Sequence, residues 1–279
     1  MINAPWAKRR LVNLAIGVPL GLLMGAVMIR LFENRLIFPA PRYPDGFVAP
    51  EAYGLKAEEV WITTSDGVRI NAWFFPNESS SRVLLLFHGN AENIGTSLGR
   101  TKVLFALGLN ILAVDYRGYG KSEGSPDEAG VYRDADAAYR YLVETRGFRP
   151  KDVVVHGVSL GGAVAIDLAS RTECGALIVE SSFTSARELG RHALLIPLYA
   201  YVLRSRFNSI AKIATVKAPV LVIHGTKDEL IPFAMGEQLH RAAREPKSFV
   251  PIEGAGHNDV LFVGGQAYIE NLQSFLEQW

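Results

Sequence analysis

The segment Gly157–Gly161 reads Gly-Val-Ser-Leu-Gly and follows a β-branched run that begins at Val153. Glycines two residues before and two residues after a serine suit a turn so sharp that larger side chains would collide there. Such a turn holds the serine in a strained conformation that exposes its hydroxyl above a sheet. The pattern predicts that Ser159 is a nucleophile and that the Leu160 N–H points to where an oxyanion would form.

The residues around this pattern decide between a nucleophile and a chance match. Five-residue patterns with two glycines arise by chance, and a serine at a helix start is often only a cap. Here Asp152–His156 predicts a strand, and Gly162–Ser170 predicts a helix with a small apolar face. A strand, a turn and a helix are the context that the motif requires, which favours the nucleophile.

A serine hydroxyl is too weakly acidic to attack unaided, so Ser159 needs a general base and the base needs an orienting carboxylate. Asp228 follows the apolar run Val220–His224, and His257 follows the run Ser248–Ile252. The order serine, acid, histidine is the one that accompanies this type of nucleophile. We therefore predict a catalytic triad of Ser159, Asp228 and His257.

Other residues compete for these roles. Asp228 is also placed to cap the turn at Glu229–Pro232, and Glu180 and Asp115 end predicted strands as well. Three of the remaining histidines, His88, His156 and His224, fall within strands or at their ends, where hydrogen-bonded structural roles are expected. His192 and His240 fall on helical stretches, where they are expected to be solvated or to pack in the lid.

A second oxyanion donor is expected from the loop Phe87–Asn93, which follows an early strand. Gly89 permits a close approach of the backbone, and the Asn90 N–H is the predicted donor, with Ala91 as the neighbouring possibility. The sequence has no cluster with zinc-site spacing, and Gly118–Ser122 lacks the first glycine of a phosphate loop. We predict no metal and no cofactor.

The elements that must position these residues alternate between strands and helices. Apolar runs that are continuous rather than alternating indicate a parallel sheet with helices on both faces. A hairpin of Glu59–Thr64 and Val68–Pro76 precedes them. The other predicted strands are Arg82–Phe87, Asn110–Asp115, Asp152–His156, Ala176–Glu180, Val220–His224 and Ser248–Ile252, and the helices are Ile94–Leu107, Ala129–Thr145, Gly162–Ser170, Phe233–Ala243 and Gly265–Gln278. The prediction is an α/β fold with a mostly parallel, eight-stranded sheet.

Composition excludes one class of partner. The chain has 29 Lys and Arg against 28 Asp and Glu in 279 residues, so no basic surplus points to nucleic acid. Its single cysteine, Cys174, rules out an intramolecular disulfide and leaves the compartment open.

Residues 11–29 carry no charge and are long enough to span a bilayer. Lys8, Arg9 and Arg10 precede them, which places the N-terminus in the cytoplasm and the rest of the chain across the membrane. A cleaved signal peptide and a buried core helix are the alternatives, but the run is long for a signal peptide and apolar on all sides. We predict a cytoplasmic tip and transmembrane anchor at 1–35, an irregular lead-in at Pro39–Pro50, and a catalytic domain at 36–279.

Five segments taken together resemble the α/β-hydrolase superfamily, and more narrowly its membrane-anchored α/β-hydrolase-domain proteins, which include depalmitoylase-like and serine aminopeptidase-like members. The resemblance covers about residues 36–279 and implies the triad roles derived above. It also implies an α/β-hydrolase fold with a short helical lid, here about 183–217. The segments are Leu86–Ala91, Asp115–Ser122, Gly157–Gly162, His224–Asp228 and Gly256–His257.

The lid contains the apolar run Leu194–Leu203, which suits an acyl-chain wall, a membrane-facing surface or simple packing on the core. Together with the anchor, it suggests a small acyl or lipid-like substrate, or a lipidated protein. The resulting hypothesis is a serine hydrolase that cleaves an ester or thioester through an acyl-enzyme. The alternatives are a peptidase, with Glu92, Glu123 or Glu180 recognising a free N-terminus, and an inactive membrane-tethered scaffold.

Overall fold

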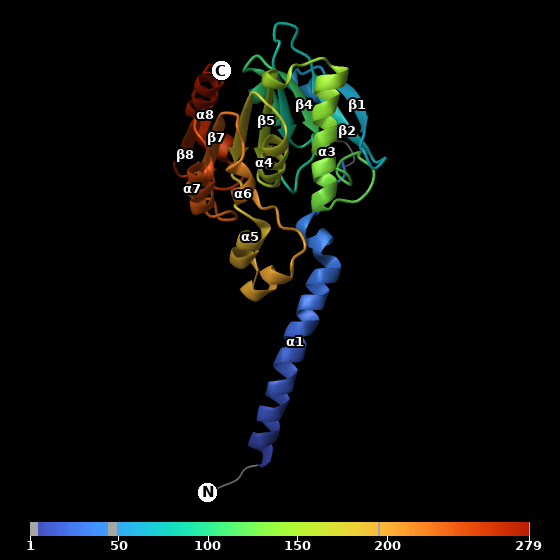
Figure 1. Ribbon diagram of the computed structural model, residues 1–279, viewed down its shortest axis with the longest axis vertical. Helices are drawn as coiled ribbons and strands as arrows, with labels where there is room; N and C mark the ends of the chain where they lie inside the picture. The colour runs from blue at the N-terminus through green and yellow to red at the C-terminus, as the bar shows by residue number, and fades with distance from the viewer. Residues whose placement is uncertain (1–4, 44–48, 195, 279) are drawn as a thin grey trace.

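The computed structural model describes residues 5–43, 49–194 and 196–278. Its head is a sheet covered by helices on both faces, and α1 (Pro5–Ile37) extends from the head as a long stalk (Figure 1). The eight strands of the sheet are β1 (Glu58–Thr63), β2 (Arg69–Phe75), β3 (Val83–Phe87), β4 (Asn110–Val114), β5 (Val153–Val158), β6 (Ala176–Glu180), β7 (Val220–Gly225) and β8 (Lys247–Ile252).

The strand order is β1-β2-β4-β3-β5-β6-β7-β8. The pairs β1–β2 and β2–β4 are antiparallel, and every pair from β4 to β8 is parallel. This confirms the predicted α/β class and the mostly parallel sheet. Because the parallel strands point the same way, their carboxyl ends meet at one edge, where such sheets place their sites.

Alternate side chains of the strands enter two separate cores. Val83, Leu85 and Phe87 of β3 belong to one core, and Leu84 and Leu86 belong to the other. Helices α3 (Glu128–Arg140), α4 (Leu160–Arg171), α6 (Ser209–Ile213) and α7 (Phe233–Ala242) supply the first core, and α2 (Leu98–Phe105) and α8 (Val260–Leu276) supply the second. Burial on both faces explains why the strand sequences are continuously apolar.

Helix boundaries differ from the predictions at identifiable places. Helix α2 begins at Leu98 because Asn93 and Thr96 form a side-chain turn, in which the Thr96 N–H donates to Asn93 Oδ1 at 3.0 Å. Helix α8 begins at Val260 and is interrupted at Gly265, where φ is +50°. The predicted helix, Gly265–Gln278, covers only the part of α8 that follows this interruption. Helix α3 ends at Arg140 and continues as a π-helical turn, η2 (Tyr141–Thr145).

The lid lies between β6 and β7 and contains α5 (Ala186–Ala193), the 3-10 segment η4 (Pro197–Val202) and α6. Segments α5 and η4 project from the head beside the near end of α1 (Figure 1). Within α1, residues Ala15–Ile37 are long and apolar enough to cross a membrane. The irregular lead-in falls partly at 44–48, outside the described residues, and then forms a short 3-10 turn, η1 (Pro50–Tyr53).

Candidate active site

Ser159 occupies the turn between β5 and α4 with φ +55° and ψ −115°. A Cβ atom at position 157 would lie 2.0 Å from the Gly161 carbonyl O, and one at position 161 would lie 2.2 Å from the Phe87 carbonyl O. Both positions therefore require glycine. A positive φ at a serine costs on the order of 1–3 kcal/mol, and such strain is found at functional sites.

A chain of hydrogen bonds links three residues from distant parts of the sequence. His257 Nδ1 lies 2.8 Å from Asp228 Oδ2, and His257 Nε2 lies 3.0 Å from Ser159 Oγ. The residues sit beyond the carboxyl ends of β5, β7 and β8, at one edge of the sheet. The structure thus brings together the three residues that the sequence pattern singled out.

The protonation of Asp228 determines the direction of these bonds. Burial alone would raise the pKa of Asp228, but hydrogen bonds from His224, His257 and the Ile231 N–H outweigh it and hold that pKa well below its usual value. An ionised carboxylate only accepts hydrogen bonds. His257 Nδ1 therefore carries a proton, and in the neutral imidazole Nε2 has the lone pair that accepts the Ser159 hydroxyl hydrogen.

The two competing carboxylates have other partners. Glu180 is buried and accepts hydrogen bonds from the Arg100 guanidinium at 2.7 Å and the Tyr268 hydroxyl at 2.7 Å. Asp115 accepts hydrogen bonds from the Tyr43 hydroxyl at 2.8 Å and the Ile94 N–H at 2.9 Å. Neither of them contacts His257.

The loop after β3 brings Asn90 to the same cavity as Ser159 and Leu160. Neither the Asn90 nor the Leu160 main-chain N–H donates a hydrogen bond to another described residue. Leu160 is the first residue of α4, so its N–H also lies at the positive end of a helix dipole. The arrangement is suited to binding a negative oxygen.

Side-chain contacts that the sequence did not predict hold this loop. The Asn90 side-chain amide donates to the Ile37 carbonyl O, at the end of α1, and its Oδ1 accepts from the Tyr119 hydroxyl at 2.8 Å. Glu92 Oε2 accepts from the Gly89 N–H at 3.0 Å. Tyr119 comes from the segment Gly118–Ser122, which is a tight loop near the site rather than a phosphate loop.

The remaining histidines have structural surroundings. His88 donates from Nδ1 to the Gly89 carbonyl O at 2.7 Å, and His224 Nε2 lies 3.0 Å from the Ile231 carbonyl O. His156 is fully buried beside Glu180, and burial lowers its pKa. His192 is exposed on α5, and His240 on α7 stacks on Phe249.

An apolar cavity of about 250 Å³ opens from Ser159. Apart from Ser159 and Asn90, its described lining is apolar and comes from three places. Leu160 belongs to the turn into α4, and Ile29, Leu36 and Ile37 belong to α1. The lid contributes Phe183, Ala186, Leu189, Gly190, Ala193, Leu194, Leu203 and Phe207. The helix predicted as an anchor is therefore also a wall of the cavity, which its uniform apolar composition did not reveal.

Recognition of a free N-terminus would require an available carboxylate. Glu180 is taken by Arg100 and Tyr268, and Glu123 pairs with Arg69 at the exposed surface. Glu92 binds the Gly89 N–H. None of the three acids considered for a peptidase lines the cavity beside Ser159.

The chain is similar in sequence to a known family of hydrolases. The family model described as serine aminopeptidase, S33 matches residues 78–212. Alpha/beta hydrolase domain-containing protein 17B of Homo sapiens is 38% identical over 230 residues, which cover 80% of this chain and 76% of that protein. The chain belongs to the α/β-hydrolase superfamily.

Two further matches extend across most of this α/β-hydrolase. The alpha/beta hydrolase domain-containing protein WAV2 of Arabidopsis thaliana is 32% identical over 283 residues, 91% of each chain. The solved structure of the Pyrococcus furiosus esterase Pf2001 superposes with a TM-score of 0.74 at 22% identity and covers 86% of this chain and 97% of that one. The structural match shows the shared fold, and the family supports a hydrolase activity.

Proposed function

We propose that this α/β-hydrolase is a membrane-anchored serine hydrolase that cleaves the ester or thioester bond of an acylated substrate. The observation that carries the proposal is the hydrogen-bonded chain from Asp228 through His257 to a strained Ser159 that lines an apolar cavity. An apolar cavity beside an activated serine suits an acyl chain on the carbonyl under attack.

In the proposed mechanism, His257 Nε2 takes the Ser159 proton as Oγ attacks the substrate carbonyl carbon. The carbonyl oxygen becomes an oxyanion that accepts hydrogen bonds from the Leu160 and Asn90 N–H groups. Asp228 stabilises the imidazolium, which then protonates the leaving alcohol or thiol. Water attacks the acyl-enzyme by the same route, with His257 again as base, and releases the carboxylic acid and Ser159.

The proposal includes the membrane. By its length and composition α1 suits a single-pass anchor, with Lys8, Arg9 and Arg10 on the cytoplasmic side and the head on the other. Both a lipid and a lipidated protein present their acyl chains at a membrane, and both are proposed substrates.

The first test is covalent labelling of the detergent-solubilised protein with a fluorophosphonate probe, followed by mass mapping of the modified peptide. The expected result is modification of Ser159 in the wild type and none in Ser159→Ala of equal thermal stability. An unlabelled wild-type protein that is folded by circular dichroism would contradict an activated serine and favour the inactive scaffold.

A further inference from the structure

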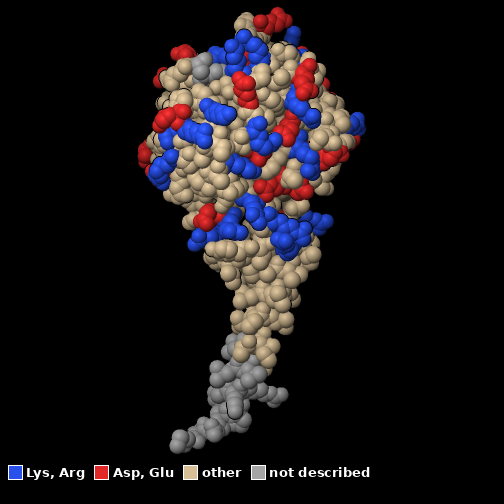
Figure 2. Space-filling model, in the orientation of Figure 1, with Lys and Arg blue, Asp and Glu red and all other residues tan. Residues whose placement is uncertain are grey.

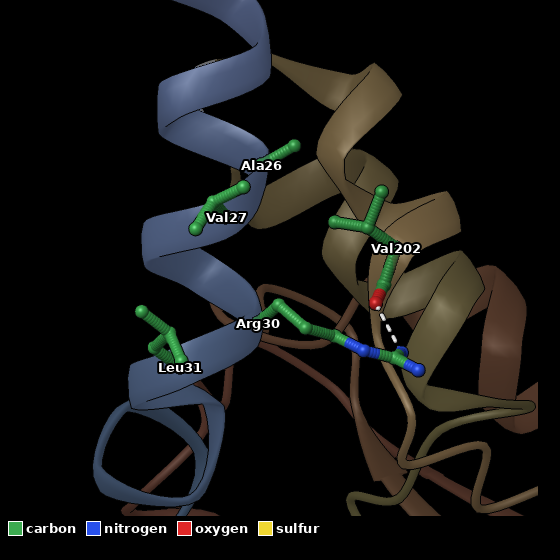
Figure 3. Close-up of a pocket in the computed structure, with 5 residues that line it drawn as sticks. All are labelled: Ala26, Val27, Arg30, Leu31 and Val202. Carbon is green, nitrogen blue, oxygen red and sulfur yellow. Dashed lines mark hydrogen bonds between the residues drawn. The ribbon is translucent and has the colours of Figure 1, made fainter.

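The lid is fixed to α1 by three separate contacts. The Arg30 guanidinium reaches across to the Val202 carbonyl O of η4 at 2.8 Å (Figure 3). One turn further along α1, the buried Glu33 carboxylate accepts the main-chain N–H groups of Arg204 at 2.8 Å and Ser205 at 2.6 Å. These contacts hold η4 beside the part of α1 around Arg30 and Glu33, so the two segments share the same surroundings.

The third contact shows that the lid extends along α1 into the uncharged part of that helix. The Tyr199 hydroxyl packs against Gly25, where an added Cβ would lie 2.1 Å from it. The uncharged run of α1 ends at Ile29, before Arg30, and begins after Arg10. At 1.5 Å per residue this run spans about 28 Å, close to the roughly 30 Å of a bilayer core. Gly25 and Tyr199 then lie about 7 Å inside that core, within the roughly 5–10 Å typical of interfacial helices.

The part of the lid at this depth is apolar and faces outward. Residues 193–203 contain no charged side chain. Leu198 is 63% exposed and Tyr201 is 54% exposed, while Ile196 is exposed beside them. We call Ile196, Leu198 and Tyr201 the lid tip. On the same turns of α1 as Gly25, the side chains of Met24, Val27 and Met28 are exposed as well, and the Gly25–Tyr199 contact joins this apolar stretch of the helix to the lid.

Arginines surround this apolar surface on the side of the head. They flank the lid tip in sequence and continue onto the last turns of α1. We call this group the arginine collar, and its members are Arg30, Arg35, Arg187, Arg191, Arg204 and Arg206. Figure 2 shows blue clusters where the head narrows into the stalk, with uncharged surface below them.

The positive charge is concentrated at the collar and is not a property of the whole chain. The lid, residues 183–217, contributes four arginines to the collar and contains one acid, Glu188, which pairs with Arg191, whereas the whole chain has a net charge of only +1. Arg30, Arg35 and Arg204 line one groove of about 510 Å³, and the Glu33 carboxylate beside them is already bound by main-chain N–H groups. Guanidinium groups bind phosphate oxygens in a bidentate manner, so the groove suits lipid phosphates.

We propose that the lid tip and the arginine collar form a bilayer-docking surface, in which the tip lies among the acyl chains next to α1 and the collar binds the phosphates of anionic phospholipids. The inference rests on the membrane anchoring included in the proposed function. The cavity walls Ile29 and Leu194 then lie at the boundary of the hydrocarbon. An acyl chain enters sideways from the leaflet and reaches Ser159 without crossing water.

The depth of the lid tip is the first test. Leu198→Cys and the control Ser79→Cys, in the exposed loop between β2 and β3, are each labelled with an environment-sensitive NBD fluorophore. The native Cys174 is buried, and burial also raises the pKa of its thiol to about 12, so we expect it to react far more slowly than an exposed cysteine at neutral pH. The full-length proteins are placed in nanodiscs of phosphatidylcholine containing some phosphatidylglycerol.

The expected result is blue-shifted emission at position 198 and several-fold stronger quenching by lipids brominated on their acyl chains than at position 79. Iodide in the buffer should quench the label at position 79 more strongly than the label at position 198. Equal iodide quenching at both positions would overturn the proposal. Protection from iodide without acyl-chain quenching would also overturn it, because the tip would then be covered by protein, such as a second copy.

The collar is tested with the triple variant Arg35→Gln, Arg191→Gln and Arg204→Gln carrying the label at 198. The matched control is Arg69→Gln, Lys121→Gln and Arg133→Gln, three exposed cations on the head. Adding phosphatidylglycerol should increase acyl-chain quenching in the wild type and in the control but not in the collar variant. An equal increase in all three proteins would show that the collar does not bind the anionic lipid.

Fluorophosphonate labelling of the same nanodiscs separates this inference from the proposed function. A buried lid tip with an unreactive Ser159 would reject the hydrolase and leave the docking surface standing. A reactive Ser159 with a water-exposed tip would reject the docking surface alone.

Discussion

Asp228 follows β7 and Glu180 is the last residue of the neighbouring strand β6, but their carboxylates have different partners. Asp228 accepts from His257 Nδ1 and the Ile231 N–H, whereas Glu180 is enclosed with Arg100 and Tyr268. In sequence both are acids at the end of an apolar run. Only the packing of α2 and α8 over the sheet separates their roles.

Substitution distinguishes the two acids. Asp228→Asn should lower kcat by about 10⁴-fold, because the amide favours the wrong tautomer of His257. Glu180→Gln should keep most of its activity but lose about 3–5 kcal/mol of stability, because Arg100 is left as an unpaired buried charge. Ester hydrolysis and thermal denaturation measure the two effects. Loss of kcat in Glu180→Gln, with Asp228→Asn unaffected, would reverse the assignment.

The same ion pair predicts a pH dependence of stability. Burial would raise the pKa of Glu180, but the Arg100 charge, together with the interactions of His156 and Tyr268, outweighs it and lowers that pKa from 4.5 to about 2. The unfolded chain therefore takes up this proton first as the pH falls. The stabilisation is complete above about pH 4.5 and is lost between there and about pH 2. We expect the free energy of unfolding, measured by urea denaturation, to fall less steeply below pH 4.5 in Glu180→Gln than in the wild type. The same pH dependence in both proteins would contradict a stabilising Glu180–Arg100 pair.

Sequence predicted the residues of the site better than the contacts that hold them. Ser159, Asp228 and His257 each have a local signal, a glycine-flanked turn or a position just after an apolar strand. The Asn90 side chain, Tyr119 and Glu92 have no such signal, since their contacts join segments distant in sequence or arise from loop geometry. The catalytic roles themselves stay a prediction until the serine is labelled.

At the scale of elements, the turn into α4 depends on close backbone approaches. Gly161→Ala would place a Cβ 2.2 Å from the Phe87 carbonyl O, so the first turn of α4 must move away from β3. Activity should fall by at least tenfold, with a loss of stability of about 1–3 kcal/mol. Gly99→Ala in α2 is the control, because nothing lies within 4 Å of its Cβ. It should stabilise the fold by about 0.5–1 kcal/mol in urea denaturation. Wild-type activity in Gly161→Ala would show that catalysis does not need the close approach of Gly161 to the Phe87 carbonyl O.

The packing of η4 on α1 is a second element-scale feature. Gly25→Leu would displace Tyr199 and separate the lid from the helix, whereas Gly21→Leu, on a face with nothing within 4 Å, would not. The cavity wall contributed by α1 should then open. We expect a several-fold higher KM for long-chain p-nitrophenyl esters in Gly25→Leu and unchanged hydrolysis of p-nitrophenyl acetate. Equal KM values for long-chain esters in Gly25→Leu and Gly21→Leu would show that the acyl chain does not bind against α1.

The order and type of the elements followed from apolar periodicity, but several boundaries did not. The start of α2 depends on the Asn93–Thr96 turn. Helix α8 consists of two helical segments that meet at a kink at Gly265, and residues of both segments pack in the same core. Sequence periodicity identified the segment after the kink, whereas the segment before it depends on tertiary packing.

For the whole molecule, the proposed orientation across the membrane rests on the charges near the apolar run of α1. Lys8, Arg9 and Arg10 precede it, and Arg30 and Arg35 follow it with Glu33 between them. Alkaline phosphatase fused after Trp279 should be active, because this reporter folds only outside the cytoplasm. Cytoplasmic green fluorescence from an equivalent fusion would reverse the orientation, with the anchor itself unaffected.

The wall that α1 contributes to the cavity changes how substrate is encountered. Under the proposed function the pocket is closed by the protein's own anchor, so acyl chains reach it by diffusion in two dimensions. Turnover then follows the mole fraction of substrate among the surrounding lipids rather than its amount per volume of buffer. Inert lipid added to the same vesicles acts as a diluent, and an enzyme with this geometry responds to the composition of its membrane.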